Sequence, residues 1–165
     1  MVKFAANGVA GEERALGTVL CVCERTAGAV DSAPVESLTR SIVSRYRGQW
    51  SGSLDSAWTM TFDGPARAIR AAGAVMAVLA QAGIAASAGL HTGECAQRNG
   101  GVEGMAVSVA RAIAERAAPG ELLISRTVKD LVAGAAFRFT ERGRHVMPED
   151  AGEWRLYAVQ SFVGV

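Results

Sequence analysis

The residue types that could support metal chemistry are scarce in this sequence. Its five aspartates are Asp31, Asp55, Asp63, Asp130 and Asp150. Hard divalent cations need clustered carboxylate oxygens, which so few aspartates rarely supply. The three cysteines and two histidines show neither a C-x-x-C pair nor a paired histidine spacing, so neither a zinc site nor any other metal site is expected. Cys21 and Cys23 are predicted to be buried core residues on one face of a strand.

The composition excludes several functional classes. The chain has 165 residues, enough for one domain, and 17 basic against 16 acidic side chains give a net charge of +1. Nucleic-acid and membrane-surface binders need a concentrated basic excess, so neither partner is expected. The uncharged segment 71–90 is rich in alanine and interrupted by Gln81 and Gly83, which indicates a helix followed by a buried strand rather than a membrane span. The small, odd number of cysteines and the absence of a signal-peptide pattern predict a cytoplasmic location.

The elements that must position any site follow from hydrophobic periodicity and turn signals. Strands are predicted at 17–23, 49–62 (a hairpin turning at 53–56), 84–91, 94–97, 121–125, 137–140 and 153–159. Helices are predicted at 33–47, 64–82, 104–117 and 126–133, with a turn at Thr92–Gly93. This order predicts an antiparallel-rich α+β sheet with helices on one face, formed by residues 17–165, with 1–16 as a linker or N-terminal extension.

Five segments, in order along the chain, resemble a class III adenylate/guanylate (nucleotidyl) cyclase domain. They are TFDGPARAI at 61–69, GLHTGE at 89–94, GMAV at 104–107, PGELLISRTVKDLVAG at 119–134 and GEWRLYA at 152–158. The resemblance implies a ferredoxin-like α+β fold with helices packed on the sheet. It also implies a head-to-tail homodimer with nucleotide pockets at its interface.

The family's reaction is a metal-assisted attack of the ribose 3′-hydroxyl on the α-phosphate. Two aspartates hold the ions, and a lysine and an aspartate select adenine. Seven positions of this chain correspond to the family's metal-binding, base-selecting, transition-state and phosphate-binding residues, and the chain differs from the family at all seven. The residues found there are Cys23, Gly52, Ser56, Gly101, Ser108, Ala112 and Pro148. Asp55 and Arg111 each lie one residue away from a family position. These departures predict a catalytically degenerate domain that is not an enzyme and needs no cofactor.

The residues that replace the family's charged side chains are mostly small, which leaves space for a ligand. A pocket with no remaining function would tend to fill with bulky apolar side chains, because voids cost stability. The candidate ligand-binding residues are Arg25, Trp50, Gly52, Ser56, Trp58, Gly101, Val102, Ser108 and Arg111. Trp50 and Gly52, two residues apart, are expected on one strand face, where Trp50 could stack on a base. The alternatives are a core or interface tryptophan and, for Arg25 and Arg111, solvated surface arginines in place of phosphate ligands.

The predicted function is therefore binding of a cyclic mononucleotide as a sensory module of a larger effector. Gly52 and Gly101 replace the adenine-selecting side chains, so adenine has no advantage, and a resemblance to sensory modules of pyrimidine-cyclase antiphage systems favours a pyrimidine ligand such as cUMP or cCMP over cAMP. The resemblance extends to sensory modules linked to an upstream effector domain, including TIR-type antiphage defence proteins. Two alternatives remain at this point: an active nucleotidyl cyclase with displaced metal ligands, and a structural dimerisation domain.

Overall fold

The strands form one mixed sheet in the order β2-β3-β1-β4-β6-β8-β7, and β5 pairs with β4 outside this path. A computed structural model describes residues 13–26, 33–98 and 100–161. The strands are β1 (Glu13–Glu24), β2 (Gln49–Leu54), β3 (Ala57–Phe62), β4 (Ala86–Arg98), β5 (Gly101–Glu103), β6 (Leu122–Ser125), β7 (Arg138–Met147) and β8 (Gly152–Ser161). The helices are α1 (Ala33–Arg45), α2 (Pro65–Gln81), α3 (Met105–Arg116) and α4 (Arg126–Leu131). Among the described residues, only β4 and β6 pair in parallel, so the predicted antiparallel-rich α+β fold is confirmed.

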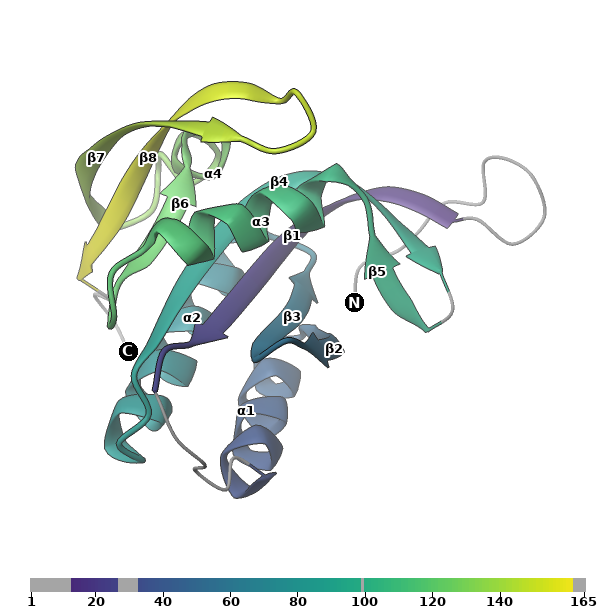
Figure 1. Ribbon diagram of the computed structural model, residues 1–165, viewed down its shortest axis with the longest axis vertical. Helices are drawn as coiled ribbons and strands as arrows, with labels where there is room; N and C mark the ends of the chain where they lie inside the picture. Colours follow the sequence, from purple (N-terminus) through teal and green to yellow (C-terminus); the bar gives the residue numbers. More distant parts are fainter. Residues whose placement is uncertain (1–12, 27–32, 99, 162–165) are drawn as a thin grey trace.

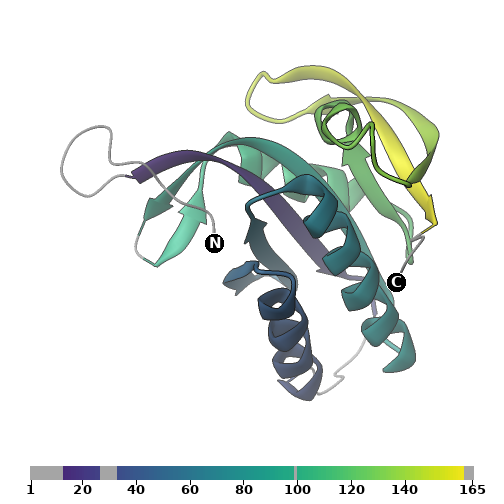
Figure 2. The ribbon, with the colours of Figure 1, turned by 180° about the vertical axis from the view of Figure 1, so that it is seen from behind.

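Helices cover both faces of this sheet, and the prediction of helices on one face was wrong. Figure 1 shows α3 in front of the central strands, and Figure 2 shows α1 and α2 on the opposite side. The reason is visible in β1, whose alternate side chains are apolar in both directions. Leu20 and Val22 join the core under α1 and α2, whereas Cys21 and Cys23 join the cluster under α3. A strand that is apolar on both faces needs cover on both.

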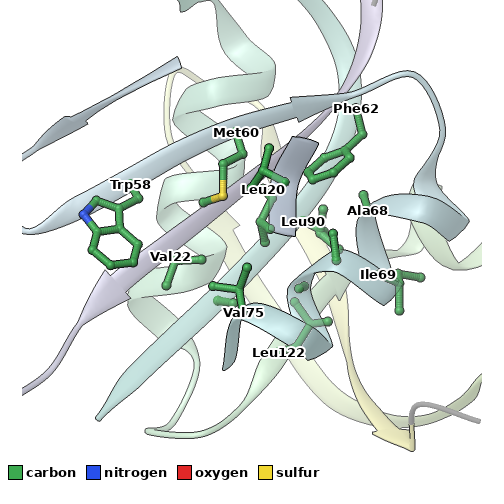
Figure 3. Close-up of a cluster of buried hydrophobic side chains, with 14 of the residues drawn as sticks. Leu20, Val22, Trp58, Met60, Phe62, Ala68, Ile69, Val75, Leu90 and Leu122 are labelled. Atoms are coloured by element: carbon green, nitrogen blue, oxygen red, sulfur yellow. The ribbon is translucent and has the colours of Figure 1, made fainter. Parts of the chain in front are cut away.

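The face of the sheet that α1 and α2 cover carries the main hydrophobic core. Leu20, Met60, Phe62, Ile69 and Leu90 are each fully buried there, between the central strands and α2. Figure 3 shows how side chains from β1, β3 and β4 meet those of α2 in this layer. Burial of large aliphatic and aromatic side chains is the dominant stabilising contribution in a domain of this size.

Two boundaries differ from the sequence prediction: the end of the strand expected at 84–91, and the start of the strand expected at 17–23. The turn expected at Thr92–Gly93 is absent, because β4 runs unbroken from Ala86 to Arg98. It does so because β1 begins at Glu13 and pairs with β4 along twelve consecutive positions, from Glu13 opposite Gln97 to Glu24 opposite Ala86. The part of the expected N-terminal extension that precedes residue 13 lies outside the described residues. No helix in the described part of the chain is both long enough and apolar enough to cross a membrane.

Candidate functional site

The chemistry-bearing residues converge on the α3 side of the sheet, where β1 ends. Cys21 and Cys23 point toward α3, and Ala57 lies opposite Cys23 in the neighbouring strand β3. Alanines of α3, including Ala110 and Ala114, pack against the two thiols. Small residues on both sides bring the helix close to the sheet at this point.

The β2–β3 turn lies next to the end of β1, as the hairpin prediction required. Asp55 and Ser56 form the turn with φ values of 50° and 60°, the left-handed region that aspartate tolerates better than most residues. The backbone N–H of Glu24 donates to the carbonyl oxygen of Ser56 at 3.0 Å, which ties the turn to β1. The backbone of the turn is therefore held against β1.

Arg111 reaches this turn from α3. Its Nη2 lies 3.7 Å from Oδ2 of Asp55, and its Nε lies 3.2 Å from Oε1 of Glu115 one helical turn later. The hydrogen bond to Glu115, together with the charge of Asp55, raises the pKa of Arg111. Asp55 and Arg111 thus form an ion pair in the folded chain. In the sequence, each lies one residue away from a position that has a catalytic role in the family.

The Cys21–Cys23 pair lies beside this ion pair. A hydrogen bond from the Cys21 thiol and the nearby Arg25 charge lower the pKa of Cys23 to about 7, against the opposing effect of burial. The same hydrogen bond and burial raise the pKa of Cys21. Both thiols are buried, as the sequence predicted.

Arg25 has well-defined protein partners at the end of β1. Its Nε donates to Oγ of Ser87 at 2.9 Å, and its Nη2 donates to the carbonyl oxygens of Ala114 and Glu115 at 3.1 and 2.8 Å. The guanidinium therefore satisfies carbonyls near the C-terminus of α3 and fixes that helix against β1. Its predicted phosphate contact remains a prediction.

The expected alignment of Trp50 with Gly52 on one strand face is wrong. A β-bulge separates them, so Trp50 pairs with Met60 whereas Gly52 pairs with Thr59. Because adjacent residues of β3 face opposite sides, Trp50 faces α1 and α2. Its ring lies 5.5 Å from that of Trp58, and Arg40 of α1 stacks over it at 4.5 Å. The tryptophan pair thus packs against the main core, away from the α3 side.

The remaining candidates lie on or near the α3 side. Gly52, with φ of 141°, has open space where a side chain would stand, and a Cβ at Gly101 would lie 3.5 Å from the carbonyl oxygen of Ser51. Val102 packs against the cysteine cluster. Ser108, one helical turn before Arg111, donates to Oε1 of Glu149 at 2.8 Å.

Two acidic residues that sequence reasoning missed take part in this arrangement. Glu115 follows Arg111 by four residues on a helix, a spacing that predicts an ion pair and was readable from the sequence. Glu149 comes from the β7–β8 connection, far from Ser108 in the chain, and its contact is visible only in the fold.

The two-metal arrangement of the family does not fit these side chains. The sequence comparison places the metal positions at Cys23 and Ser56, and the carboxylate of the neighbouring residue Asp55 is paired with Arg111 and three-quarters exposed. Among the described residues, no three His, Cys, Asp or Glu side chains are grouped so that they could hold a metal ion. Arg111 supplies a guanidinium at this place, and a guanidinium binds phosphate oxygens through charge-assisted hydrogen bonds.

Solved structures share this fold across almost the whole chain. An adenylate/guanylate cyclase/hydrolase from Silicibacter pomeroyi has a TM-score of 0.80 at 18% identity, covering 92% of this chain and 100% of that one. The adenylyl cyclase CyaB of P. aeruginosa has a TM-score of 0.79 at 16% identity, covering 92% and 97%. The guanylate cyclase domain of RhGC from Catenaria anguillulae, solved with GTP, has a TM-score of 0.76 at 14% identity, covering 92% and 99%. No protein-family model matches the sequence, and the comparison with curated proteins finds no match.

The fold is therefore that of class III adenylate/guanylate cyclase domains, as the sequence resemblance implied. The prediction that the chain is not an enzyme was wrong, because the solved structures with this fold are adenylyl and guanylyl cyclases, which are enzymes. That prediction treated single substituted positions as lost functions. It gave too little weight to neighbouring residues such as Asp55 and Arg111, which the fold brings together.

Proposed function

We propose that this chain binds a nucleoside triphosphate on the α3 side of the sheet and converts it to a cyclic mononucleotide. The observation that carries the proposal is the contact between Arg111 of α3 and Asp55 of the β2–β3 turn, beside the Cys23 thiol. A guanidinium held at a defined position is the side chain best suited to phosphate oxygens. The fold supports nucleotide binding as such, since the Catenaria domain with the same fold was solved with GTP.

The proposed reaction is an intramolecular displacement at the α-phosphorus. The ribose 3′-oxygen forms a new bond to phosphorus, the bond from phosphorus to the β-phosphate oxygen breaks, pyrophosphate leaves, and the hydroxyl proton passes to water. Arg111 binds the oxygens on which negative charge accumulates and lowers the barrier electrostatically. Asp55 and Glu115 act as positioning residues that orient the guanidinium. The small side chains at Gly52 and Gly101 support a preference for cytosine or uracil, since neither position retains an adenine-selecting group.

Product formation tests the catalytic part of the proposal. The full chain is incubated separately with ATP, GTP, CTP and UTP plus manganese, and cyclic nucleotides are quantified by mass spectrometry. We expect product from at least one pyrimidine triphosphate and about a 100-fold loss in Arg111→Gln, the magnitude typical of removing one charge-stabilising donor. Arg45→Gln removes an exposed arginine from α1, on the opposite face, and should retain wild-type activity. No product above a protein-free blank with any of the four triphosphates would refute catalysis.

Calorimetry with cyclic CMP, UMP, AMP and GMP tests which cyclic nucleotide the site accepts. We expect the two pyrimidine compounds to bind more tightly than the purines, and Arg111→Gln to weaken all four. Tighter binding of cyclic AMP or GMP would refute the pyrimidine preference and leave the catalytic proposal intact.

The proposal includes a head-to-tail homodimer and attachment to an effector domain. Leu54 and Met105, next to the site on β2 and α3, are 66% and 47% exposed, which supports a partner surface there. Light scattering of the wild type and of Leu54→Lys tests the dimer, which the variant should weaken. Attachment to an upstream effector, such as a TIR domain, rests on the sequence resemblance, and the sequence encoded next to this domain tests it.

A further inference from the structure

A polar cavity of about 420 Å³ lies at the junction of α4, β7 and β8. Its lining residues are Arg126, Thr127, Arg144, Glu153, Trp154 and Arg155. They come from the end of the sheet opposite to the β2–β3 hairpin, as Figure 1 shows. None of them belongs to β1, β2, β3 or α3, so the cavity is separate from the candidate nucleotide site.

The three arginines converge in a way that is unfavourable without an anion. Arg144 and Arg155 are direct cross-strand partners in the antiparallel pair β7–β8, and like charges at such positions repel. Arg126 adds a third guanidinium from the start of α4. Glu153 is the one carboxylate in the lining. From outside the lining, Asp130 lies 3.5 Å from Arg126 and Glu141 lies 3.7 Å from Arg155, so each arginine has one acidic neighbour.

The acidic partners of these arginines compensate the repulsion only weakly. The nearest nitrogen–oxygen distances are 3.5 Å for Arg144–Glu153 and 3.7 Å for Arg155–Glu141. Charge-assisted hydrogen bonds are about 2.7–2.9 Å long, and exposed ion pairs at larger separations contribute little. All four side chains are 43–60% exposed, so solvent screens these pairs further. The guanidinium N–H groups therefore still have capacity to bind an anionic ligand.

We propose that this cavity binds the diphosphate group of a small phosphorylated ligand. Guanidinium forks match phosphate oxygens in geometry, and three guanidinium groups around one cavity, each with only a distant acidic partner, suit a ligand that carries at least two negative charges. The volume exceeds that of a single phosphate and lies in the range of small-molecule sites. This proposal does not depend on the cyclase activity proposed for the α3 side.

Calorimetry on the full chain at low ionic strength, with inorganic pyrophosphate as the probe, tests the site. We expect saturable binding that Arg144→Gln and Arg155→Gln each weaken at least tenfold. Arg138→Gln is the matched control, because it removes the same charge from β7 at an exposed position outside the cavity, and it should bind within twofold of the wild type. CDP as a second probe, used in the Arg111→Gln background so that the candidate nucleotide site on the α3 side is weakened, separates the sources of the group: tenfold tighter binding than pyrophosphate identifies a nucleotide, and equal binding identifies a free diphosphate.

Thermal unfolding without ligand provides a second measurement. If Arg144 had a merely structural role, its replacement would lower the unfolding temperature. Removal of Arg144 relieves its repulsion with Arg155, so Arg144→Gln should unfold at the same temperature as the wild type or higher, yet lose the stabilisation by pyrophosphate. No binding of pyrophosphate at 5 mM would overturn the proposal, as would equal weakening in Arg138→Gln. Arg111→Gln should bind pyrophosphate normally in the cavity, so a failure of the cyclase proposal leaves this test unaffected.

Discussion

The two faces of the central strands are built from different kinds of residues. On the side of α1 and α2, large side chains such as Phe62, Met60 and Leu90 fill a continuous core. On the side of α3, the buried residues next to β1 are cysteines, alanines and one valine. Polar side chains are also buried on this second face, including Ser87, which donates to the Ala114 carbonyl oxygen at 2.7 Å.

Within one sheet, the α1/α2 face is therefore expected to determine mainly the stability, and the α3 face mainly ligand binding. The α1/α2 face buries large apolar area and has little polar chemistry. Next to β1, the α3 face is packed with small residues, which bring the helix close enough for Arg111 to reach a turn at the end of β1. Mutations on the first face should therefore mainly lower the free energy of unfolding, and those around the candidate site on the second face should mainly alter ligand binding.

The largest stability effect is expected from Phe62→Ala on the α1/α2 face. Phe62 is fully buried, and its truncation should lower the free energy of unfolding by about 3–5 kcal/mol, since lost burial and an unfilled cavity both contribute. Cys21→Ala at the matched depth on the α3 face should cost about 1 kcal/mol, because little volume is removed. Urea unfolding of both variants measures the contrast, and equal losses would contradict the division between the faces.

Gly89→Ala tests how closely α3 packs on the sheet. A Cβ at Gly89 would overlap the backbone nitrogen of Ala114 and lie 2.5 Å from the carbonyl oxygen of Ala110. The helix would have to move, so we expect a loss of about 3 kcal/mol in urea unfolding and weaker nucleotide binding. Gly64→Ala is the control, because Gly64 has an extended backbone and open space around its Cβ position. A Gly89→Ala protein as stable as Gly64→Ala would show that the helix is not held against the strand.

His91 makes the stability of the α3 side depend on pH. Burial lowers the pKa of His91 to about 4 from its ordinary 6.5, and its Nδ1 shares a hydrogen bond of 2.9 Å with Oγ of Ser125. The unfolded chain therefore binds more protons between these values. The stabilisation is present above pH 6.5 and is lost progressively as the pH falls toward 4.

Between pH 7.5 and 5.5 this effect should lower the free energy of unfolding by about 1 kcal/mol. Urea titrations at the two pH values measure it. His91→Gln should reduce the difference, whereas His145→Gln, at a less buried histidine whose Nε2 contacts the Arg142 carbonyl oxygen, should keep it. An unchanged difference in His91→Gln would assign the pH dependence to other groups.

The sequence was informative where local patterns determine structure. The hairpin turn at 53–56, the four helices and the burial of Cys21 and Cys23 were all predictable from periodicity and turn residues, whereas the strand predicted at 94–97 is part of β4 and the short β5 was missed. The bulge between Trp50 and Gly52 was not, because one extra residue reverses side-chain direction without any change in composition. The contact of Asp55 with Arg111 depends on long-range packing of α3 on β1, which position-by-position comparison with a motif does not capture.

The smallest stability effect, and the sharpest test of the division between the faces, is Asp55→Asn. Its side chain is 75% exposed, and the Arg111 contact at 3.7 Å contributes little to folding, so the free energy of unfolding should change by less than about 0.5 kcal/mol. Nucleotide binding should nevertheless weaken several-fold, because Arg111 loses the group that orients it. Glu36→Gln removes the acid of an ion pair with Arg40 on α1, on the other face, and should change neither quantity measurably. If Asp55→Asn and Glu36→Gln bound nucleotide equally well, the ion pair at the β2–β3 turn would be an ordinary surface contact and the site would have to lie elsewhere on the α3 side.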